Sequence, residues 1–127
     1  MIDASVDGPV ARITLDRPAA HNALDRAALA ELLAVLDDWA SRDDIRALVL
    51  TGRGRSFCAG AALGDVGASD WTDNPLTRFC DALETIPLPT VAGLNGGAYG
   101  GGVELALACD FRIGVEGMRA FVPPAGS

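Results

Sequence analysis

The sequence predicts an α/β protein, because a strand, a glycine-rich loop and a helix follow one another twice along the chain. The short apolar run at 47–51 is typical of a strand that is buried on both faces of a parallel sheet, and an amphipathic helix precedes it. With 127 residues, 50% of them hydrophobic, the chain is long enough to bury a core without disulfides or a metal. We therefore expect one domain built on a parallel sheet.

The first three elements follow from hydrophobic periodicity. A strand is expected at 10–15, where apolar and polar residues alternate until Asp16-Arg17-Pro18 ends it. A helix is expected from about Asp25, because apolar residues then recur every three or four positions, and either Asn22 or Asp25 can cap its first turn. The strand at 47–51 comes next, so the first unit is a strand, a helix and a second, parallel strand.

The later elements are marked by glycines and prolines. Pro87 and Pro89 end a helix, and glycines dominate two loops, each of which directly follows a buried strand. In order, we expect a glycine-rich loop at 52–60, a short helical turn at 61–66, a polar loop at 67–74, a helix at 75–86, a strand at 90–94, a glycine loop at 95–102, a helix at 103–109, and strands at 111–115 and 119–122.

Charge and residue usage argue against several functions. Seventeen Asp and Glu against ten basic residues give a net charge of −7, which disfavours non-specific binding to nucleic acid. All ten basic residues are arginine, so neither a Schiff-base lysine nor the lysine of a phosphate loop is present. Cys58, Cys80 and Cys109 are widely spaced, and the single His21 is distant from them in sequence, so no metal site is expected.

We expect a cytoplasmic protein without a membrane segment. The first residues lack the basic and apolar regions of a secretory signal. The longest apolar stretch, 91–109, includes six glycines, Asn95 and Glu104, which a membrane-spanning helix does not favour. The cysteines are then expected to be reduced and to be buried as small apolar residues.

A functional site is expected at the two glycine loops. Each loop places backbone N–H groups without hydrogen-bond partners at the start of a helix, and such groups attract negative charge. Their glycine spacing fits neither a dinucleotide loop nor a phosphate loop. Ser56 lacks the glycines of a nucleophile elbow, and Cys58 with His21 has no third member. The remaining candidate is Glu104, in an otherwise apolar helix. Glu104 is either a solvent-facing residue or partner of Arg112, or a general acid/base beside an oxyanion hole of backbone amides.

Three runs of sequence resemble the crotonase superfamily, the enoyl-CoA hydratase/isomerase family. They are 13–24, which contains Ala-His-Asn-Ala-Leu; 47–61, which ends in Ser-Phe-Cys-Ala-Gly-Ala; and 89–110, which contains Asn-Gly-Gly-Ala-Tyr-Gly-Gly-Gly-Val-Glu. The resemblance implies a crotonase-like ββα spiral, truncated before the C-terminal half, since subunits of the family are about twice this length. Residues 1–127 would then form the N-terminal part of a single crotonase-like acyl-CoA-binding domain.

The resemblance also implies where the site lies. The backbone amides of Ala61 and Gly101 would hold the oxygen of an acyl-CoA thioester as it becomes an enolate, with Glu104 as the catalytic general acid/base. Coenzyme A would be part of the substrate, and no separate cofactor or metal is implied. The substrate-binding positions would be His21, Ala23, Leu24, Ala59, Ala61, Ala62, Leu63 and Gly101. For His21, a solvated loop position is the alternative.

Two positions depart from the family pattern. The second catalytic glutamate of the family's hydratases falls on Ala125, and Ala62 stands where an Asp is common, with Asp65 nearby in the sequence. A single carboxylate suits double-bond isomerisation, decarboxylation or hydrolysis better than hydration. The sequence thus predicts an acyl-CoA thioester enzyme of the enoyl-CoA hydratase/isomerase type. The alternative is a catalytically incomplete fragment or remnant that at most binds acyl-CoA.

The expected partner is an acyl-CoA substrate, with no nucleic acid and no membrane. A complete member of the family would be a homo-oligomer, either a trimer or a hexamer. A chain of this length would instead expose the apolar faces of its strands and the edge of its sheet, and we expect it to self-associate.

Overall fold

The computed structural model describes residues 1–60, 75–115 and 120–121. Its helices are α1 (Arg26–Ala40), α2 (Pro75–Thr85) and α3 (Gly101–Ala108), with a short 3₁₀ turn at Pro18–Ala20. Its strands are β1 (Ile2–Asp7), β2 (Val10–Leu15), β3 (Ala47–Gly52), β4 (Ser56–Cys58), β5 (Thr90–Leu94), β6 (Gly97–Tyr99), β7 (Phe111–Gly114) and β8 (Ala120–Phe121). The helices and strands expected from periodicity are confirmed within these ranges, and the turn and loop expected at 61–66 and 67–74 lie outside the described residues.

The described strands form two sheets. The larger has the order β1-β2-β3-β5-β7, and the smaller has the order β4-β6-β8. β1 pairs with β2 in antiparallel fashion, whereas β2, β3, β5 and β7 are parallel to one another. The predicted parallel α/β sheet is therefore confirmed, with one antiparallel strand added at its edge.

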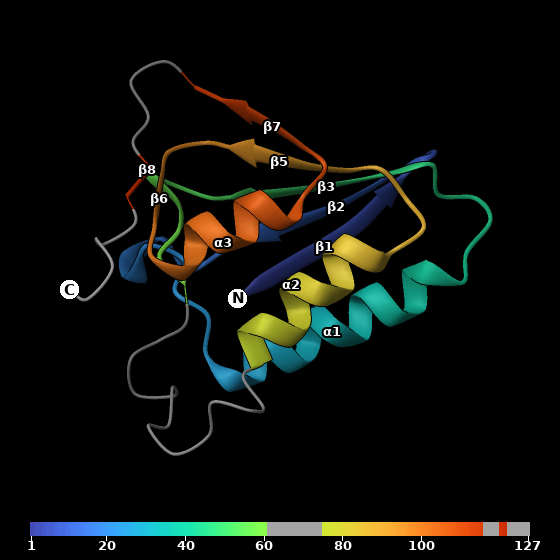
Figure 1. Cartoon of the computed structure of the whole chain (residues 1–127), viewed down its shortest axis with the longest axis horizontal. Coiled ribbons are helices and arrows are strands. Elements are labelled where there is room, and N and C mark those ends of the chain that lie inside the picture. The colour runs from blue at the N-terminus through green and yellow to red at the C-terminus, as the bar shows by residue number, and fades with distance from the viewer. Residues whose placement is uncertain (61–74, 116–119, 122–127) are drawn as a thin grey trace.

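The helices of the described chain lie together on one side of the larger sheet (Figure 1). Their apolar side chains pack on the strand residues that point to that side, such as Ile13 of β2 and Leu48 and Leu50 of β3, all fully buried. The alternate residues of β3 are only partly buried. The expectation that this strand is buried on both faces is therefore wrong, because no described helix covers the second face.

α1 forms where the apolar period predicts it. Its buried side chains include Leu29, Leu32, Leu36 and Trp39, which lie on one face of the helix. Asp25 is the N-cap, because its carboxylate accepts a hydrogen bond from the backbone N–H of Ala28 at 2.8 Å. Of the two capping residues weighed from the sequence, Asp25 is thus the one used.

The structure adds three strands that the sequence did not predict. β1 lies at the edge of the larger sheet and most of its residues are exposed, although Ile2, Ala4 and Val6 alternate with polar residues as in a strand. β4 and β6 lie inside the two glycine loops, where they pair with each other in parallel. Each glycine loop therefore contains a short strand of the second sheet, and α3 starts at Gly101, two positions before the expected 103.

Two hydrogen bonds join the start of β5 to the turn between α3 and β7. The backbone N–H of Thr90 donates to the Asp110 carboxylate, and the backbone N–H of Asp110 donates to the Thr90 hydroxyl, both at 2.9 Å. Thr90 is fully buried at the start of β5, and Asp110 lies between α3 and β7. The reciprocal pair therefore holds the return of the chain from α3 into the sheet.

Candidate functional site

The two glycine loops meet where β4 ends and α3 begins. A Cβ atom at Gly102 would overlap the backbone carbonyl of Cys58, so only glycine lets the helix approach this closely. A Cβ atom at Gly60, whose φ is +89°, would lie 2.9 Å from the amide nitrogen of Gly101. The turn after β4 and the first turn of α3 are therefore in direct backbone contact.

The start of α3 is suited to binding negative charge. Its N-cap is Gly100, which has no side chain to accept from the first amides, and the Val103 N–H instead donates to the Gly100 carbonyl at 3.0 Å. Among the described residues, no hydrogen bond from the Gly101 N–H to a capping side chain is present. Uncapped amides at the positive end of a helix dipole attract an anion or a developing oxyanion.

Of the two amides predicted to form the oxyanion hole, the structure places Gly101 at the first position of α3, beside Gly60. Ala61, Ala62 and Leu63 lie outside the described residues, as do Asp65 and Ala125. The pairing of the Ala61 and Gly101 amides therefore stays a prediction.

Glu104 lies in the first turn of α3 and is exposed. It is not the partner of Arg112, whose guanidinium donates to the carbonyls of Ala106 at 3.3 Å and Cys109 at 3.0 Å. Burial, followed by the charges of Glu104 and other nearby acids, raises the pKa of the Cys80 thiol to about 12. Glu104 thus faces the surface at the start of α3, on the side of α2.

The loop at 21–24 is attached to the turn after β4. The backbone N–H of Leu24 donates to the Gly60 carbonyl at 2.7 Å, and the Cys58 thiol donates to the Asn22 carbonyl at 3.3 Å. Leu24 is fully buried, whereas Ala23 and Ala59 are partly exposed. The structure therefore brings together the described parts of the three stretches in which coenzyme A contacts were predicted. They are the loop at 21–24, residues 59–60 and Gly101.

Asn22 organises this region, a role beyond the helix cap that its residue type suggested. It is fully buried and adopts a positive φ of 58°. Its Nδ2 donates to the carbonyls of Arg53, Ser56 and Phe57, at 3.0, 2.9 and 3.3 Å. Its Oδ1 accepts from the Arg17 N–H at 2.8 Å. A single amide side chain therefore joins the loop after β2 to the loop that leads into β4.

Asn95 holds the same β3–β4 loop from the other side. Its Oδ1 accepts from the Gly52 N–H, and its Nδ2 donates to the carbonyls of Gly54 and Ser56, all at 3.0 Å. The Ser56 carbonyl thus accepts from both asparagines. This role could have been inferred from the sequence. Asn22 and Asn95 each lie in the loop after a strand of the parallel sheet, and such loops meet at the same edge of the sheet.

His21 is exposed at the surface of this loop. Its Nδ1 lies 2.9 Å from the hydroxyl of Ser56, which is buried, and its backbone has a positive φ of 52°. The contact orients the imidazole ring, and its other nitrogen makes no hydrogen bond to the described part of the chain. His21 is thus a surface residue held in place by a buried one, and its contact with coenzyme A stays a prediction.

Other chemistries find no support among the described residues. Burial raises the pKa of the Cys58 and Cys109 thiols to about 11, so neither is a thiolate near neutral pH. No group of three or more metal-ligating side chains gathers in the part of the chain that is described. No described helix is long and apolar enough to span a membrane.

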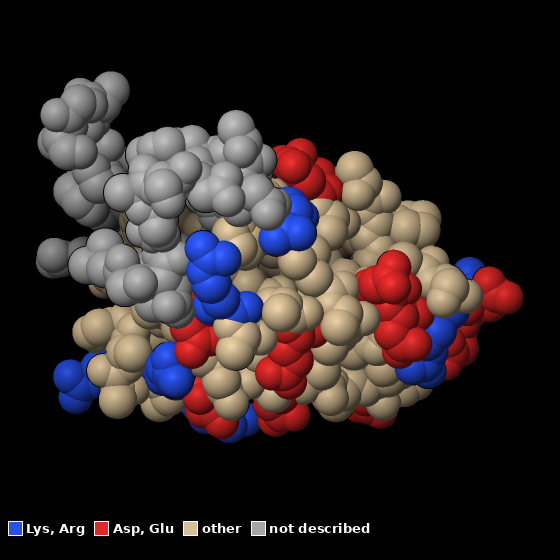
Figure 2. Space-filling view, turned by 90° about the horizontal axis from the view of Figure 1, so that it is seen from below, with Lys and Arg blue, Asp and Glu red and all other residues tan. Residues whose placement is uncertain are grey.

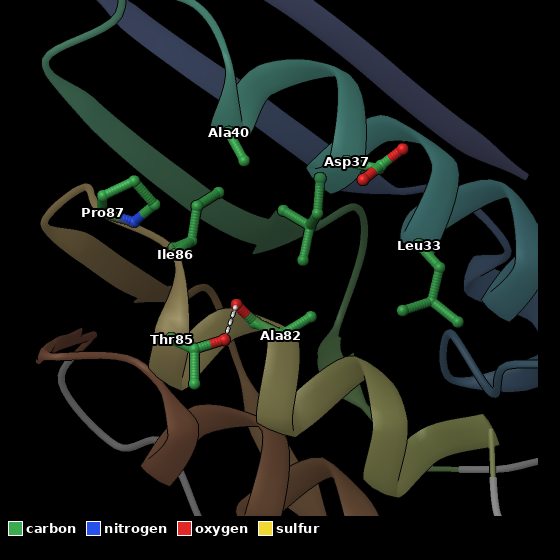
Figure 3. A pocket seen from close by; sticks show the side chains of 8 residues that line it. Leu33, Asp37, Ala40, Ala82, Thr85, Ile86 and Pro87 are labelled. Atoms are coloured by element: carbon green, nitrogen blue, oxygen red, sulfur yellow. Dashed lines mark hydrogen bonds between the residues drawn. The ribbon is translucent and has the colours of Figure 1, made fainter.

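A separate cavity lies between α1 and the C-terminal end of α2 (Figure 3). It has a volume of about 250 Å³ and is lined by Leu33, Leu36, Asp37, Ala40, Ala82, Thr85, Ile86 and Pro87. Its walls offer one carboxylate and no start of a helix, so it lacks the donors that the junction of β4 and α3 provides.

On the face of the molecule seen in Figure 2, acidic and basic side chains are interspersed.

Known proteins are similar in sequence to most of this chain. The family model for enoyl-CoA hydratase/isomerase matches residues 6–121. YngF of Bacillus subtilis, named as an enoyl-CoA hydratase/isomerase, is 38% identical over 92% of this chain and 47% of its own length. A Rhodobacter capsulatus protein named as an enoyl-CoA hydratase is 42% identical over 92% of this chain and 50% of its own. This chain spans about half the length of these curated relatives.

The solved structures agree. The crystal structure of an enoyl-CoA hydratase from Bacillus anthracis superimposes with a TM-score of 0.83 and 34% identity, over 92% of this chain and 48% of that one. The predicted crotonase-like α/β fold, as half of the fold of longer proteins, is therefore confirmed. Since one family model spans most of the chain and a solved member reproduces its fold, this chain belongs to the enoyl-CoA hydratase/isomerase family.

Proposed function

We propose that this chain forms an acyl-CoA thioester site in which backbone amides stabilise an enolate and Glu104 moves a proton. The observation that carries the proposal is the contact between the turn after β4 and the uncapped start of α3, which has Glu104 in its first turn. Relatives named as enoyl-CoA hydratases support the substrate class.

The proposed reaction begins when the Glu104 carboxylate takes a proton from the carbon next to the thioester carbonyl. The electron pair of the broken C–H bond moves onto the carbonyl oxygen, where the amides of Ala61 and Gly101 donate hydrogen bonds to it. Each such donor is worth about 3 kcal/mol in the transition state. Return of the proton two carbons further along the acyl chain would shift the double bond, which is isomerisation.

Isomerisation fits the residues of this chain better than hydration does. Hydration needs one group to position the water and another to move the proton, and the second glutamate position is Ala125. Glu104 alone can remove and return a proton. We therefore propose an isomerase-type reaction on enoyl-CoA for the site that this chain supplies.

Coenzyme A is proposed to lie along the loop at 21–24 and the turn after β4. His21 would donate to an anionic group of the nucleotide with the nitrogen that Ser56 leaves available. Ala23 and Ala59 are partly exposed beside it, and Ala62 and Leu63 would continue the surface. The net charge of −7 does not oppose this, because the donors are local amides and single side chains.

The second candidate is a chain that binds acyl-CoA without turnover. The exposure of Glu104 favours it, because an exposed carboxylate is a poorer base toward carbon than one enclosed with its substrate.

Turnover of a 3-enoyl-CoA by the wild-type chain and a Glu104→Gln variant separates these candidates. Glu84→Gln is a matched control, because Glu84 is an exposed carboxylate of α2. We expect double-bond migration in the wild type and the control, with a loss of about 10²-fold or more in Glu104→Gln. Equal rates in all three would contradict the role of Glu104, and binding without turnover would support the second candidate.

A further inference from the structure

Ser56 has a buried side chain that takes no part in the proposed reaction. It is the first residue of β4, and 4% of its surface is exposed. Its hydroxyl lies 2.9 Å from Nδ1 of His21, which is exposed. In the described part of the chain, this is the one hydrogen bond of that hydroxyl. A buried serine therefore supports a surface imidazole that lies 35 positions away in sequence.

The backbone of Ser56 is held from two sides. Its carbonyl accepts from Nδ2 of Asn22 at 2.9 Å and from Nδ2 of Asn95 at 3.0 Å. Ser56 also pairs with Gly97 of β6 in the smaller sheet. A side chain on a strand that is held in this way is a rigid support for a second side chain.

His21 is held in a conformation that residues other than glycine seldom adopt. It ends the 3₁₀ turn at Pro18–Ala20, and its φ of 52° and ψ of 33° are left-handed. Asn22, the next residue, also has a positive φ, which its buried hydrogen bonds compensate. The ring of His21 has one hydrogen bond to the described chain, the contact with Ser56. Because strained residues gather at ligand sites, the fixed ring points to a function.

The same contact bears on which nitrogen of the imidazole carries the proton. In a neutral imidazole, one ring nitrogen donates a hydrogen bond and the other accepts one. A buried hydroxyl needs an acceptor for its hydrogen, and Nδ1 of His21 is the acceptor that the described chain offers to Ser56. The arrangement favours donation from the hydroxyl to Nδ1, which leaves the proton of a neutral ring on Nε2. Nε2–H is then a donor even when the ring is uncharged.

We propose that Ser56 is a positioning residue, which fixes His21 so that its Nε2–H donates to an anionic group of the coenzyme A nucleotide. The inference rests on the proposed coenzyme A site, and it adds a residue that acts through His21 without touching the ligand. The loop at 21–24 lies against the turn after β4, where the Leu24 N–H donates to the Gly60 carbonyl at 2.7 Å. A phosphate accepts strongly from a neutral N–H, because the acceptor carries the charge. The nucleotide can therefore be held here by a chain that has no lysine and a net charge of −7.

Calorimetric titration of the 127-residue chain at pH 8 with two thioesters tests this role. Butyryl-CoA carries the nucleotide, whereas S-butyryl-pantetheine lacks it. Ser56→Ala removes the hydroxyl, and His21→Gly removes the imidazole while keeping a residue that tolerates the positive φ. Ser41→Ala is the matched control, because Ser41 is exposed at the end of α1 and its hydroxyl donates to the Asp38 carbonyl.

We expect His21→Gly to raise the dissociation constant for butyryl-CoA about tenfold or more, and Ser56→Ala to raise it about 3–10-fold. In the His21→Gly background, Ser56→Ala should add less than about twofold, because its effect passes through the ring. Ser41→Ala should bind both thioesters like the wild type, and no variant should change the affinity for S-butyryl-pantetheine by more than about twofold. A Ser56→Ala effect that persists without the imidazole, or that is equal for both thioesters, would overturn the proposal.

Nitrogen NMR at pH 8 adds a readout that a purely structural serine would not change. His21 is the one histidine of the chain, so the imidazole signals need no further assignment. We expect the proton on Nε2 in the wild type and a mixture of both neutral forms in Ser56→Ala; a wild-type ring protonated on Nδ1, or an unchanged ring in Ser56→Ala, would overturn the proposal. Binding of neither thioester would overturn it together with the coenzyme A site. If both thioesters bind as expected but no proton exchanges next to the carbonyl, the proposed reaction fails and the role of Ser56 stands.

Discussion

Removing the side chain of Asn22 is expected to destabilise the protein by about 2–4 kcal/mol. The side chain is fully buried, and its amide joins the carbonyls of Ser56 and Phe57 to the loop after β2. Each buried polar group left without a partner costs about 1–3 kcal/mol. Asn22→Gly is the cleaner substitution, because glycine tolerates the φ of 58°, whereas alanine adds about 1 kcal/mol of backbone strain.

Asn22 and Asn95 donate to the same carbonyl, so their effects on stability are expected to be coupled. The Ser56 carbonyl accepts from both side chains, so either single variant leaves it one of these two partners. Asn22→Gly/Asn95→Ala removes both at once. The double variant is therefore expected to be less stable than the sum of the single changes predicts, by about 1–2 kcal/mol.

Denaturant unfolding followed by circular dichroism measures the free energy of unfolding of the wild type, of Asn22→Gly, of Asn95→Ala and of the double variant. Glu31→Ala serves as the control, since Glu31 is exposed on α1 and surface changes of this kind stay within about 0.5 kcal/mol. Additive effects within about 0.5 kcal/mol would refute the shared-acceptor argument. An Asn22→Gly variant as stable as Glu31→Ala would refute the structural role of Asn22 itself.

Two further changes test the junction of β4 with α3 and the buried thiols. Gly102→Ala is expected to cost about 1–3 kcal/mol and to weaken acyl-CoA binding in calorimetry, because the new Cβ meets the Cys58 carbonyl. Gly100→Ala meets no atom within 4 Å and tests the backbone alone, since its φ of 52° with ψ of −121° costs another residue about 1–3 kcal/mol. The thiols keep their protons in the folded state to about pH 11 for Cys58 and about pH 12 for Cys80, above the ordinary pKa of 9.0. The free energy of unfolding should therefore fall as pH rises from about 9 toward 11–12, and thiol labelling at pH 8 should be slow until denaturant is added; rapid labelling of the folded chain would contradict this.

The sequence was sufficient for elements whose own residues determine their structure. α1 has a continuous apolar face and a capping aspartate, and β3 is a short apolar run between polar residues. Both signals are local, so neighbouring residues in sequence carry them. The parallel pairing of β2 and β3 followed from the strand–helix–strand pattern.

What the sequence did not predict depends on contacts between distant segments. β4 and β6 each have only three residues, and their pairing joins two glycine loops about 40 residues apart. Asn22 and Asp25 are equally good caps by residue type. Asn22 takes its other role only because Ser56 and Phe57 present carbonyls to it in the folded chain.

The candidate site was predictable in part. The resemblance implied backbone donors at Ala61 and Gly101, with Glu104 in the helix that follows the second glycine loop. The structure brings the two glycine loops together through Gly60 and Gly102. The sequence left open whether Glu104 faces solvent or an enclosed site, because α3 is apolar on most of its faces and its pattern does not indicate which face is covered.

The most direct test of the proposed site is exchange of the proton next to the thioester carbonyl. Butyryl-CoA, incubated with the chain in deuterium oxide and followed by proton NMR, reports enolisation without requiring hydration or isomerisation. We predict that the wild-type chain exchanges this proton about 10²-fold or more faster than Glu104→Gln, while Glu84→Gln matches the wild type. Exchange no faster with the wild type than with Glu104→Gln would contradict the account.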